Sequence, residues 1–140
     1  EKYYGEIIEL KEKHTRRGLF GFLRSGFQAI RKSKSELLGE PWNQISGFDT
    51  IYLCTPIWAG SITPAMNTFI DKADLKGKDI IIVTVMADPK LEGVETPHKY
   101  LSGLAAQKGG SIIKCIALNG SPPFKPAEKT HIKRQFDTCL

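Results

Sequence analysis

The stretch Phe48–Val85, FDTIYLCTPIWAGSITPAMNTFIDKADLKGKDIIIVTV, predicts a strand, a loop, a helix and a second strand. Thr50–Cys54 is an apolar, β-branched run of strand length. The segment that follows, Thr55–Ser61, is interrupted by proline and glycine and is therefore predicted to form a loop. Asp79–Val85 is apolar apart from Asp79 and Thr84, as expected for a strand that is covered on both faces.

Thr63 and Pro64 form a strong signal for the start of the helix. A threonine N-cap accepts a hydrogen bond from the first turn, and proline at the first helical position gives up only a bond that the helix does not make there. The spacing i, i+3, i+4, i+7 of one buried helical face is followed by Met66, Phe69, Ile70 and Ala73. The region is therefore predicted to be a βαβ crossover in a parallel sheet.

In open α/β sheets, ligands bind beyond the carboxyl ends of the strands, so we expect a cofactor at the loop from Thr55 to Thr63. The sequence here, FDTIYLCTPIWAGSITPAMNTFID followed by DLKGKDIIIVTV, resembles the flavodoxin family. It is similar to the family's third strand, first flavin-contacting loop, following helix and fourth strand. The resemblance implies an α/β fold, an open and mostly parallel flavodoxin-like sheet with helices on both faces, and a noncovalent FMN site.

The resemblance also implies which residues contact the flavin. Backbone groups of the loop would lie along the ring edge and Trp58 against one ring face; the set is Thr55, Pro56, Ile57, Trp58, Ala59, Gly60 and Ser61. An indole ring stacks well on a flat heteroaromatic ring. The alternative is that Trp58 is a packing residue.

Flavodoxins place a second flavin-contacting loop where this chain has Met86–Glu95. Three residues are candidates there: Ala87, Asp88 and Lys90. The Asp88 carboxylate could accept a hydrogen bond from a ring N–H, and the Lys90 ammonium could balance an anionic reduced ring. Pro89 has no N–H to offer the ring, and Lys90 could equally be a solvated loop residue.

The rest of the chain, residues 1–140, is predicted to belong to the same single domain. We expect a strand at Tyr4–Leu10, a helix that starts at Thr96–Pro97, a strand at Ser111–Leu118 and a closing helix over Ala127–Leu140. The helix that starts at Thr96–Pro97 has an apolar face formed by Tyr100, Leu101, Leu104 and Ala105. The closing helix has an apolar face formed by Ile132, Phe136 and Cys139.

A basic segment lies between His14 and Lys34, which contains no acidic residue. Its arginines and lysines are interleaved with leucine, phenylalanine and isoleucine at helical spacing. Such a segment can lie on anionic membranes or bind a partner; it can also cover one face of the sheet and solvate its arginines. A further fragment, Asn119-Gly120-Ser121-Pro122, is interpreted as a turn, with a phosphate-binding loop as the alternative.

The flavodoxin pattern is incomplete at its amino end. Flavodoxins open with an apolar strand and a loop that wraps the FMN phosphate, and Tyr4–Leu10 corresponds to the second strand instead. In the sheet order 2-1-3-4-5 the missing strand would lie beside Thr50–Cys54. The chain is a fragment that begins inside a longer one, or Tyr4–Leu10 fills the vacant position, or another chain supplies the strand. Without the phosphate loop, we expect FMN to bind weakly or not at all.

Composition is that of an ordinary globular domain, with 41% hydrophobic and 25% charged residues and a net charge of +5. No run is long enough to span a membrane, and no nucleic-acid recognition motif accompanies the positive charge. Cys54 and Cys115 are expected to be buried and reduced inside strands, which favours a cytoplasmic location.

The resulting hypothesis is a flavodoxin-like FMN domain that acts in electron transfer or flavin-dependent reduction, as a carrier or an FMN-dependent oxidoreductase. Its redox partner protein or nicotinamide donor is left open, and a homo-oligomer is expected if a second copy closes the sheet. The alternative is a domain of the same fold without flavin that serves in binding or assembly. His14, His98 and His131 are predicted to be exposed and not to form a hydrolytic group.

Overall fold

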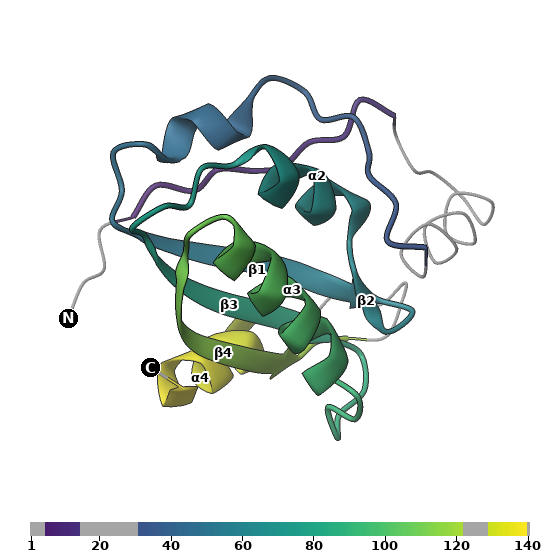
Figure 1. Cartoon of the computed structure of the whole chain (residues 1–140). Helices are drawn as coiled ribbons and strands as arrows, with labels where there is room; N and C mark the ends of the chain where they lie inside the picture. Colours follow the sequence, from purple (N-terminus) through teal and green to yellow (C-terminus); the bar gives the residue numbers. More distant parts are fainter. Residues whose placement is uncertain (1–4, 15–30, 122–128, 140) are drawn as a thin grey trace.

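A computed structural model describes residues 5–14, 31–121 and 129–139 (Figure 1). A short 3-10 helix, η1 (Pro41–Ile45), precedes the strands β1 (Thr50–Trp58) and β2 (Ser61–Ile62). The chain continues through helix α2 (Pro64–Lys72), strand β3 (Asp79–Met86) and helix α3 (Glu95–Gln107). It ends with strand β4 (Ser111–Asn119) and helix α4 (Lys129–Cys139).

The four strands form one open sheet in the order β2-β1-β3-β4. The β1–β3 and β3–β4 pairs are parallel, and only the two-residue strand β2 is antiparallel to its neighbour. Helices α2 and α3 cover one face of this sheet and α4 covers the other (Figure 1). The predicted α/β fold with a mostly parallel sheet between helices is therefore confirmed.

The main core lies between the sheet and the two helices α2 and α3. The predicted apolar face of α2 is buried, with Met66, Phe69, Ile70 and Ala73 all less than 5% exposed. These side chains meet alternate residues of the parallel strands, which include Ile51, Leu53, Ile80 and Ile82. A smaller cluster on the opposite face joins Val83, Ile116 and Leu118 to Ile132, Phe136 and Cys139 of α4, as the sequence predicts for the closing helix.

The two Thr-Pro signals have different outcomes. Thr63 is the N-cap of α2 and its side-chain oxygen accepts a hydrogen bond from the Met66 N–H at 3.3 Å, as predicted. Helix α3 starts earlier than expected: its N-cap is Val94, and no side chain caps it. Pro97 is tolerated in its first turn because the first four N–H groups of a helix have no intrahelical partner.

The strand predicted at Tyr4–Leu10 is wrong over its described residues, Gly5–Leu10, which form no ladder. A strand exists only through the hydrogen bonds of a neighbour, and the described residues supply none here. The segment still alternates, because Ile8 and Leu10 pack on the core whereas Ile7 is 94% exposed. Tyr4 lies outside the described residues, as does most of the basic segment from His14 to Lys34.

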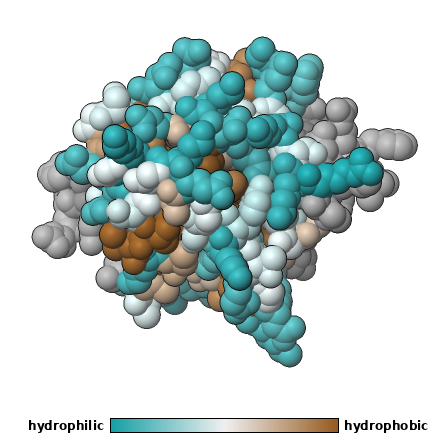
Figure 2. All heavy atoms as spheres, viewed as in Figure 1, coloured by the Kyte–Doolittle hydropathy of each residue, from teal (hydrophilic) through white to brown (hydrophobic). Residues whose placement is uncertain are grey.

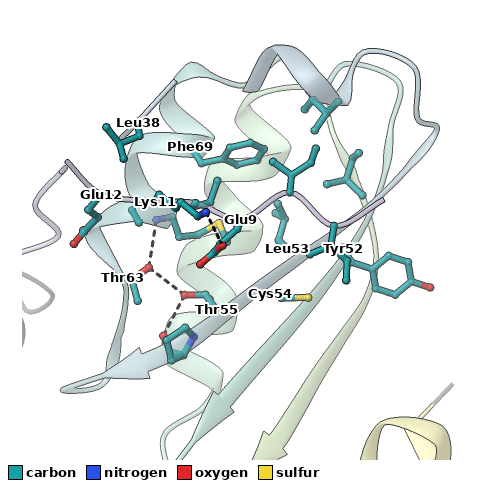
Figure 3. A pocket seen from close by; sticks show the side chains of 18 of the residues that line it. Glu9, Lys11, Glu12, Leu38, Tyr52, Leu53, Cys54, Thr55, Thr63 and Phe69 are labelled. Carbon is teal, nitrogen blue, oxygen red and sulfur yellow. Dashed lines mark hydrogen bonds and ion pairs between the residues drawn. The ribbon is translucent and has the colours of Figure 1, made fainter. Parts of the chain in front are cut away.

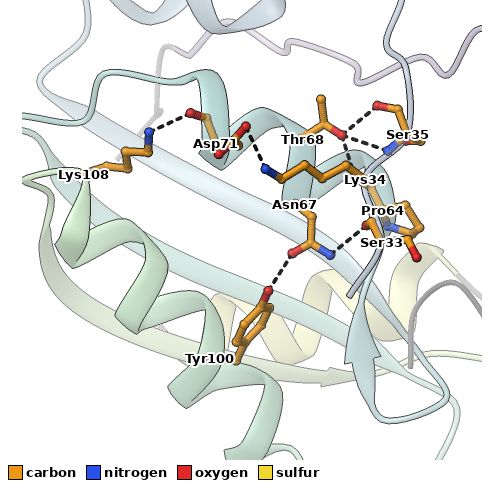
Figure 4. Close-up of polar contacts among 9 residues, drawn as sticks. All are labelled: Ser33, Lys34, Ser35, Pro64, Asn67, Thr68, Asp71, Tyr100 and Lys108. Carbon is orange, nitrogen blue, oxygen red and sulfur yellow. Dashed lines mark hydrogen bonds and ion pairs between the residues drawn. The ribbon is translucent and has the colours of Figure 1, made fainter. Parts of the chain in front are cut away.

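The segment that follows residue 30 is tied to α2 by polar contacts (Figure 4). The Ser35 N–H donates to Thr68 Oγ1 at 2.9 Å, and that hydroxyl donates to the Ser35 carbonyl at 2.7 Å. The Asn67 side chain donates to the Ser33 carbonyl at 3.2 Å and accepts from the Tyr100 hydroxyl at 3.2 Å. These bonds join a loop, α2 and α3 into one unit. The outer surface of this side of the molecule is mostly hydrophilic (Figure 2).

Candidate flavin site

Strand β1 runs four residues further than predicted, through Trp58. The residues predicted as a loop from Thr55 to Ser61 are instead the end of β1, a tight turn and the start of β2. Ala59 and Gly60 form the turn with φ angles of 47° and 75°, and Trp58 pairs with Ser61 across it. Positive φ angles at both central positions are those of the turn that suits a two-residue hairpin.

Pro56 does not interrupt the strand, because its nitrogen faces away from β3. The Asp79 N–H donates to the Asp49 carbonyl at 2.8 Å, which fixes the alternation of β1. Odd-numbered residues from Ile51 onward therefore bond to β3, and even-numbered residues turn their backbone groups to the other edge. Proline at an even position removes no bond from this ladder, whereas the sequence suggested that it would end the strand.

The candidate residues of β1 and the hairpin differ in the direction of their side chains. Thr55 is buried, and its hydroxyl lies 3.3 Å from Thr63 Oγ1 and donates to the Pro56 carbonyl at 3.1 Å. Ile57 packs on the core and Ser61 is buried. Trp58 is half-buried at the end of the strand, and Ala59 and Gly60 are exposed beside it.

The hairpin and the predicted second loop meet at one edge of the sheet. Pro56 pairs with Val85, and Met86 pairs with Asn119, so the carboxyl ends of the three parallel strands lie side by side. The Gly120 N–H donates to the Met86 carbonyl at 2.8 Å, and the Asn119 side chain donates to the Ala87 carbonyl at 3.4 Å. The fragment that begins at Asn119 thus continues from β4 at the same edge; Pro122 lies outside the described residues.

The second loop is held by Asp88. Its carboxylate accepts hydrogen bonds from the N–H groups of Lys90 and Glu92, each at 3.0 Å. Lys90 is exposed, and its ammonium lies 3.9 Å from the Glu92 carboxylate. The structure therefore gives Asp88 a role in shaping the loop that the sequence did not suggest. A carboxylate oxygen has further lone pairs, so this role leaves Asp88 able to accept from a ligand.

His98 is not exposed as predicted; it is half-buried in α3, and its Nε2 lies 2.7 Å from the hydroxyl of Thr84. Burial lowers the pKa of His98 below its ordinary value, although the nearby Glu95 carboxylate opposes this shift. Thr84 is fully buried on β3 just inside the carboxyl edge. The sequence offered one signal for this pair, a threonine within an otherwise apolar strand.

Two cavities border the hairpin. The smaller, about 160 Å³, lies between Ala59–Ser61 and the start of α3, and Lys32 and Tyr100 line it. The Lys32 ammonium lies 4.0 Å from the centre of the Tyr100 ring. This cavity is below the roughly 300 Å³ at which small-molecule sites begin, so it does not enclose a flavin.

The larger cavity, about 1190 Å³, lies between the segment Gly5–His14 and β1, with α2 behind it (Figure 3). Phe69 and Met66 of α2 and Thr55 and Trp58 of β1 are among its lining residues. Trp58 therefore borders both the carboxyl edge of the sheet and the larger cavity.

Several expectations about the surface are also tested. Cys54 and Cys115 are exposed rather than buried, because Cys54 lies on a part of β1 that no described helix covers and Cys115 lies on the edge strand β4. All three cysteines are free. Among the described residues, no three metal-ligating side chains are grouped to hold a metal ion. No helix in the described ranges has the length and apolarity needed to cross a bilayer.

Comparison with protein families finds no match for this sequence, and comparison with curated proteins finds none either. Solved structures do resemble the chain. A protein of Bacteroides uniformis, provisionally described as a flavoprotein, superimposes with a TM-score of 0.65 and 22% identity over 91% of this chain and 78% of that one. A second protein, from Bacteroides eggerthii and described in the same way, superimposes with a TM-score of 0.56 and 16% identity over 83% of this chain and 66% of that one. At these identities the likeness shows a shared α/β fold.

Proposed function

We propose that this domain binds FMN noncovalently at the carboxyl edge of its sheet and acts in electron transfer or flavin-dependent reduction. The observation that carries the proposal is the meeting of the Trp58 hairpin with the Ala87–Lys90 loop where β1 and β3 end. Open α/β sheets bind their ligands at this edge. The two similar proteins that are provisionally described as flavoproteins favour a flavin over other ligands.

The residues fit the ring of a flavin. Trp58 is half-buried at the strand end, which leaves part of the indole for stacking. The exposed backbone of Ala59 and Gly60 can donate to the ring edge, and Ala87, Asp88 and Lys90 would approach from the neighbouring loop. Pro56, Ile57, Thr55 and Ser61 would act through the backbone or by holding the hairpin. When bound, the flavin supplies the redox chemistry and the protein supplies orientation and electrostatics.

A fluorescence titration of free FMN tests the proposal, with the 140-residue chain and the natural polypeptide side by side. We expect the natural polypeptide to quench the flavin at a stoichiometry of one. If the natural polypeptide supplies a phosphate loop that the 140-residue chain lacks, the shorter chain is expected to bind far more weakly, because each charge-assisted bond to the phosphate contributes about 1.5 to 3 kcal/mol. Tight binding by the 140-residue chain would show that the phosphate needs no further segment.

The Trp58→Ala variant of the natural polypeptide tests the stacking role. Loss of about 0.5 to 1.5 kcal/mol of stacking predicts affinity about 2- to 13-fold weaker, with an unchanged circular dichroism spectrum. Trp58→Phe, which keeps an aromatic ring, is the matched control and should retain most of the affinity. An unfolded Trp58→Ala apoprotein would instead assign Trp58 to the core.

A natural polypeptide that folds and shows no flavin binding would refute the proposal. That result would favour the second candidate, a flavodoxin-like domain without flavin that serves in binding or assembly.

A further inference from the structure

The larger cavity is a slot between two extended stretches of backbone. On one side lies Gly5–Glu12, and on the other lies β1 from Thr50 to Pro56, with α2 behind (Figure 3). The lining residues from α2 are Ala65, Met66 and Phe69. Both stretches run in the same direction, from the amino edge toward the carboxyl edge of the sheet (Figure 1). The volume of about 1190 Å³ exceeds the roughly 1,000 Å³ at the upper end of small-molecule sites, so its size suits a piece of polypeptide.

The β1 side of the slot carries unused ladder groups. Because odd-numbered residues bond to β3, the N–H and C=O groups of Thr50, Tyr52 and Cys54 face the slot. Within the described residues, the only strand that pairs on this edge is β2, at Ile57 and Trp58. The free edge of a strand presents a row of unpaired N–H and C=O groups, with which a further strand can pair.

The shape of the slot favours one type of neighbour. It is closed on its far side by Gly5–Glu12, whose Ile8 and Leu10 pack on the core. The edge of a second sheet could reach β1 only by displacing that segment. A single strand fits without displacing it, and Met66 and Phe69 would meet apolar side chains on one of its faces.

The face of β1 opposite α2 gives an independent indication. Tyr52 is 39% exposed and Cys54 is exposed, whereas Val83 beside them on β3 is 4% exposed. From α4, Phe136 approaches Tyr52, with the two ring centres 6.4 Å apart. A further covering element is therefore missing from this face among the described residues.

The handedness of parallel crossovers relates the slot to the face of β1 on which Tyr52 and Cys54 are exposed. The crossover from β1 to β3 places α2 on one face of the sheet. Connections between parallel strands are right-handed in nearly all cases. The connection from β1 to β3 runs one way across the sheet, whereas a connection from a strand in the slot to Gly5–Glu12 would run the opposite way. Its connecting segment would therefore lie on the face opposite α2. That is the face on which Tyr52 and Cys54 are exposed.

We propose that a β-strand and its crossover, supplied by polypeptide that precedes Glu1 in the natural protein, fill the slot and cover Tyr52 and Cys54. The strand lies parallel to β1 and bonds to Thr50, Tyr52 and Cys54. A parallel connection needs a dozen residues or more, and the similar Bacteroides uniformis structure has about a fifth of its chain without a counterpart here. The proposal concerns the sheet and does not depend on flavin binding.

Hydrogen exchange of individual amides, measured by NMR in the apo form of the natural polypeptide, tests this. In the full polypeptide we expect Tyr52 and Cys54 amides to be as protected as those of Ile51 and Leu53, which face β3. In the 140-residue chain, Ile51 and Leu53 should stay protected while Tyr52 and Cys54 exchange about 100-fold faster or more. The odd-numbered amides are the internal control for folding.

A second readout is the reaction of Cys54 with a thiol reagent, in a variant that carries Cys115→Ala and Cys139→Ala. Labelling should be slow in the full polypeptide and fast after denaturation. Fast exchange at Tyr52 and Cys54 in the folded full polypeptide would overturn the proposal, as would a natural protein that begins at Glu1. Protection that disappears on dilution together with a dimer, measured by light scattering, would assign the strand to a second copy and overturn it as well.

Discussion

Thr63→Ala is expected to destabilise the domain much more than Thr96→Ala, although each residue is the threonine of a Thr-Pro pair that predicts a helix start. Thr63 is 7% exposed, caps α2 through the Met66 N–H and contacts the Thr55 hydroxyl. Thr96 is exposed and lies inside the first turn of α3, which has no side-chain cap. The comparison therefore separates the cap itself from the sequence motif.

The magnitude follows from the contacts of Thr63. Loss of an N-cap hydroxyl costs about 1 kcal/mol, and the weakened hydrogen bonding of the buried Thr55 hydroxyl adds about 0.5 to 1 kcal/mol. We therefore expect the free energy of unfolding to fall by about 1.5 to 2 kcal/mol in Thr63→Ala. Thr96→Ala should stay within about 0.5 kcal/mol of the wild type, as surface substitutions usually do.

Urea denaturation followed by circular dichroism, on the natural polypeptide, measures these differences. Thr63→Ser keeps the hydroxyl and is the matched control, expected within about 0.5 kcal/mol of the wild type. Equal losses in Thr63→Ala and Thr96→Ala would refute the reasoning, because the cap seen only at Thr63 would then have no energetic consequence. A neutral Thr63→Ala would refute it too.

Two further predictions concern pH and packing. Because burial lowers the folded-state pKa of His98 below its ordinary 6.5, the unfolded chain binds the proton more readily, so stability is full above pH 6.5 and declines as the pH falls toward the folded-state value. His98→Gln should reduce this decline in urea titrations between pH 5 and 7, and an unchanged profile would contradict it. Gly110→Ala should lower stability by about 1 to 3 kcal/mol, since its Cβ would lie 2.7 Å from the Ile80 side chain. Gly103→Ala, in an open position of α3, should raise stability by about 0.5 to 1 kcal/mol, and thermal melts that rank the two alike would show the packing argument to be wrong.

The sequence by itself determined the elements whose signals are local. Strand β3 (Asp79–Met86) consists mostly of β-branched residues, which favour a strand. It ends one residue later than the predicted Asp79–Val85. Thr63 and Pro64 start α2 where predicted, because a cap and its first turn involve only neighbouring residues. The apolar faces of α2 and α4 followed from helical spacing in the same way.

The sequence predicted where in the fold the candidate residues lie, but not the backbone conformation or the side-chain contacts that they have there. That the candidate residues after β1 and β3 lie at the carboxyl edge of the sheet, where open α/β sheets bind ligands, follows from the order of strand and helix. Whether Pro56 ends β1 depends on which edge its nitrogen faces, and that is set by the register with β3, about 30 residues away. The contact of His98 with Thr84 likewise depends on how α3 lies on the sheet, which local periodicity does not reveal.

Only the tertiary structure decided the state of Gly5–Leu10. Its alternation of exposed and core-facing side chains suits a strand, but a strand also needs a neighbour whose backbone lies within hydrogen-bonding distance. Here the described neighbour, β1, lies across a slot of about 1190 Å³, so the segment keeps its buried side chains Ile8 and Leu10 and forms no ladder. The pattern of side chains can be read from the sequence of one segment, whereas backbone pairing depends on how two segments lie in space. The sequence of this protein could therefore predict the first and not the second.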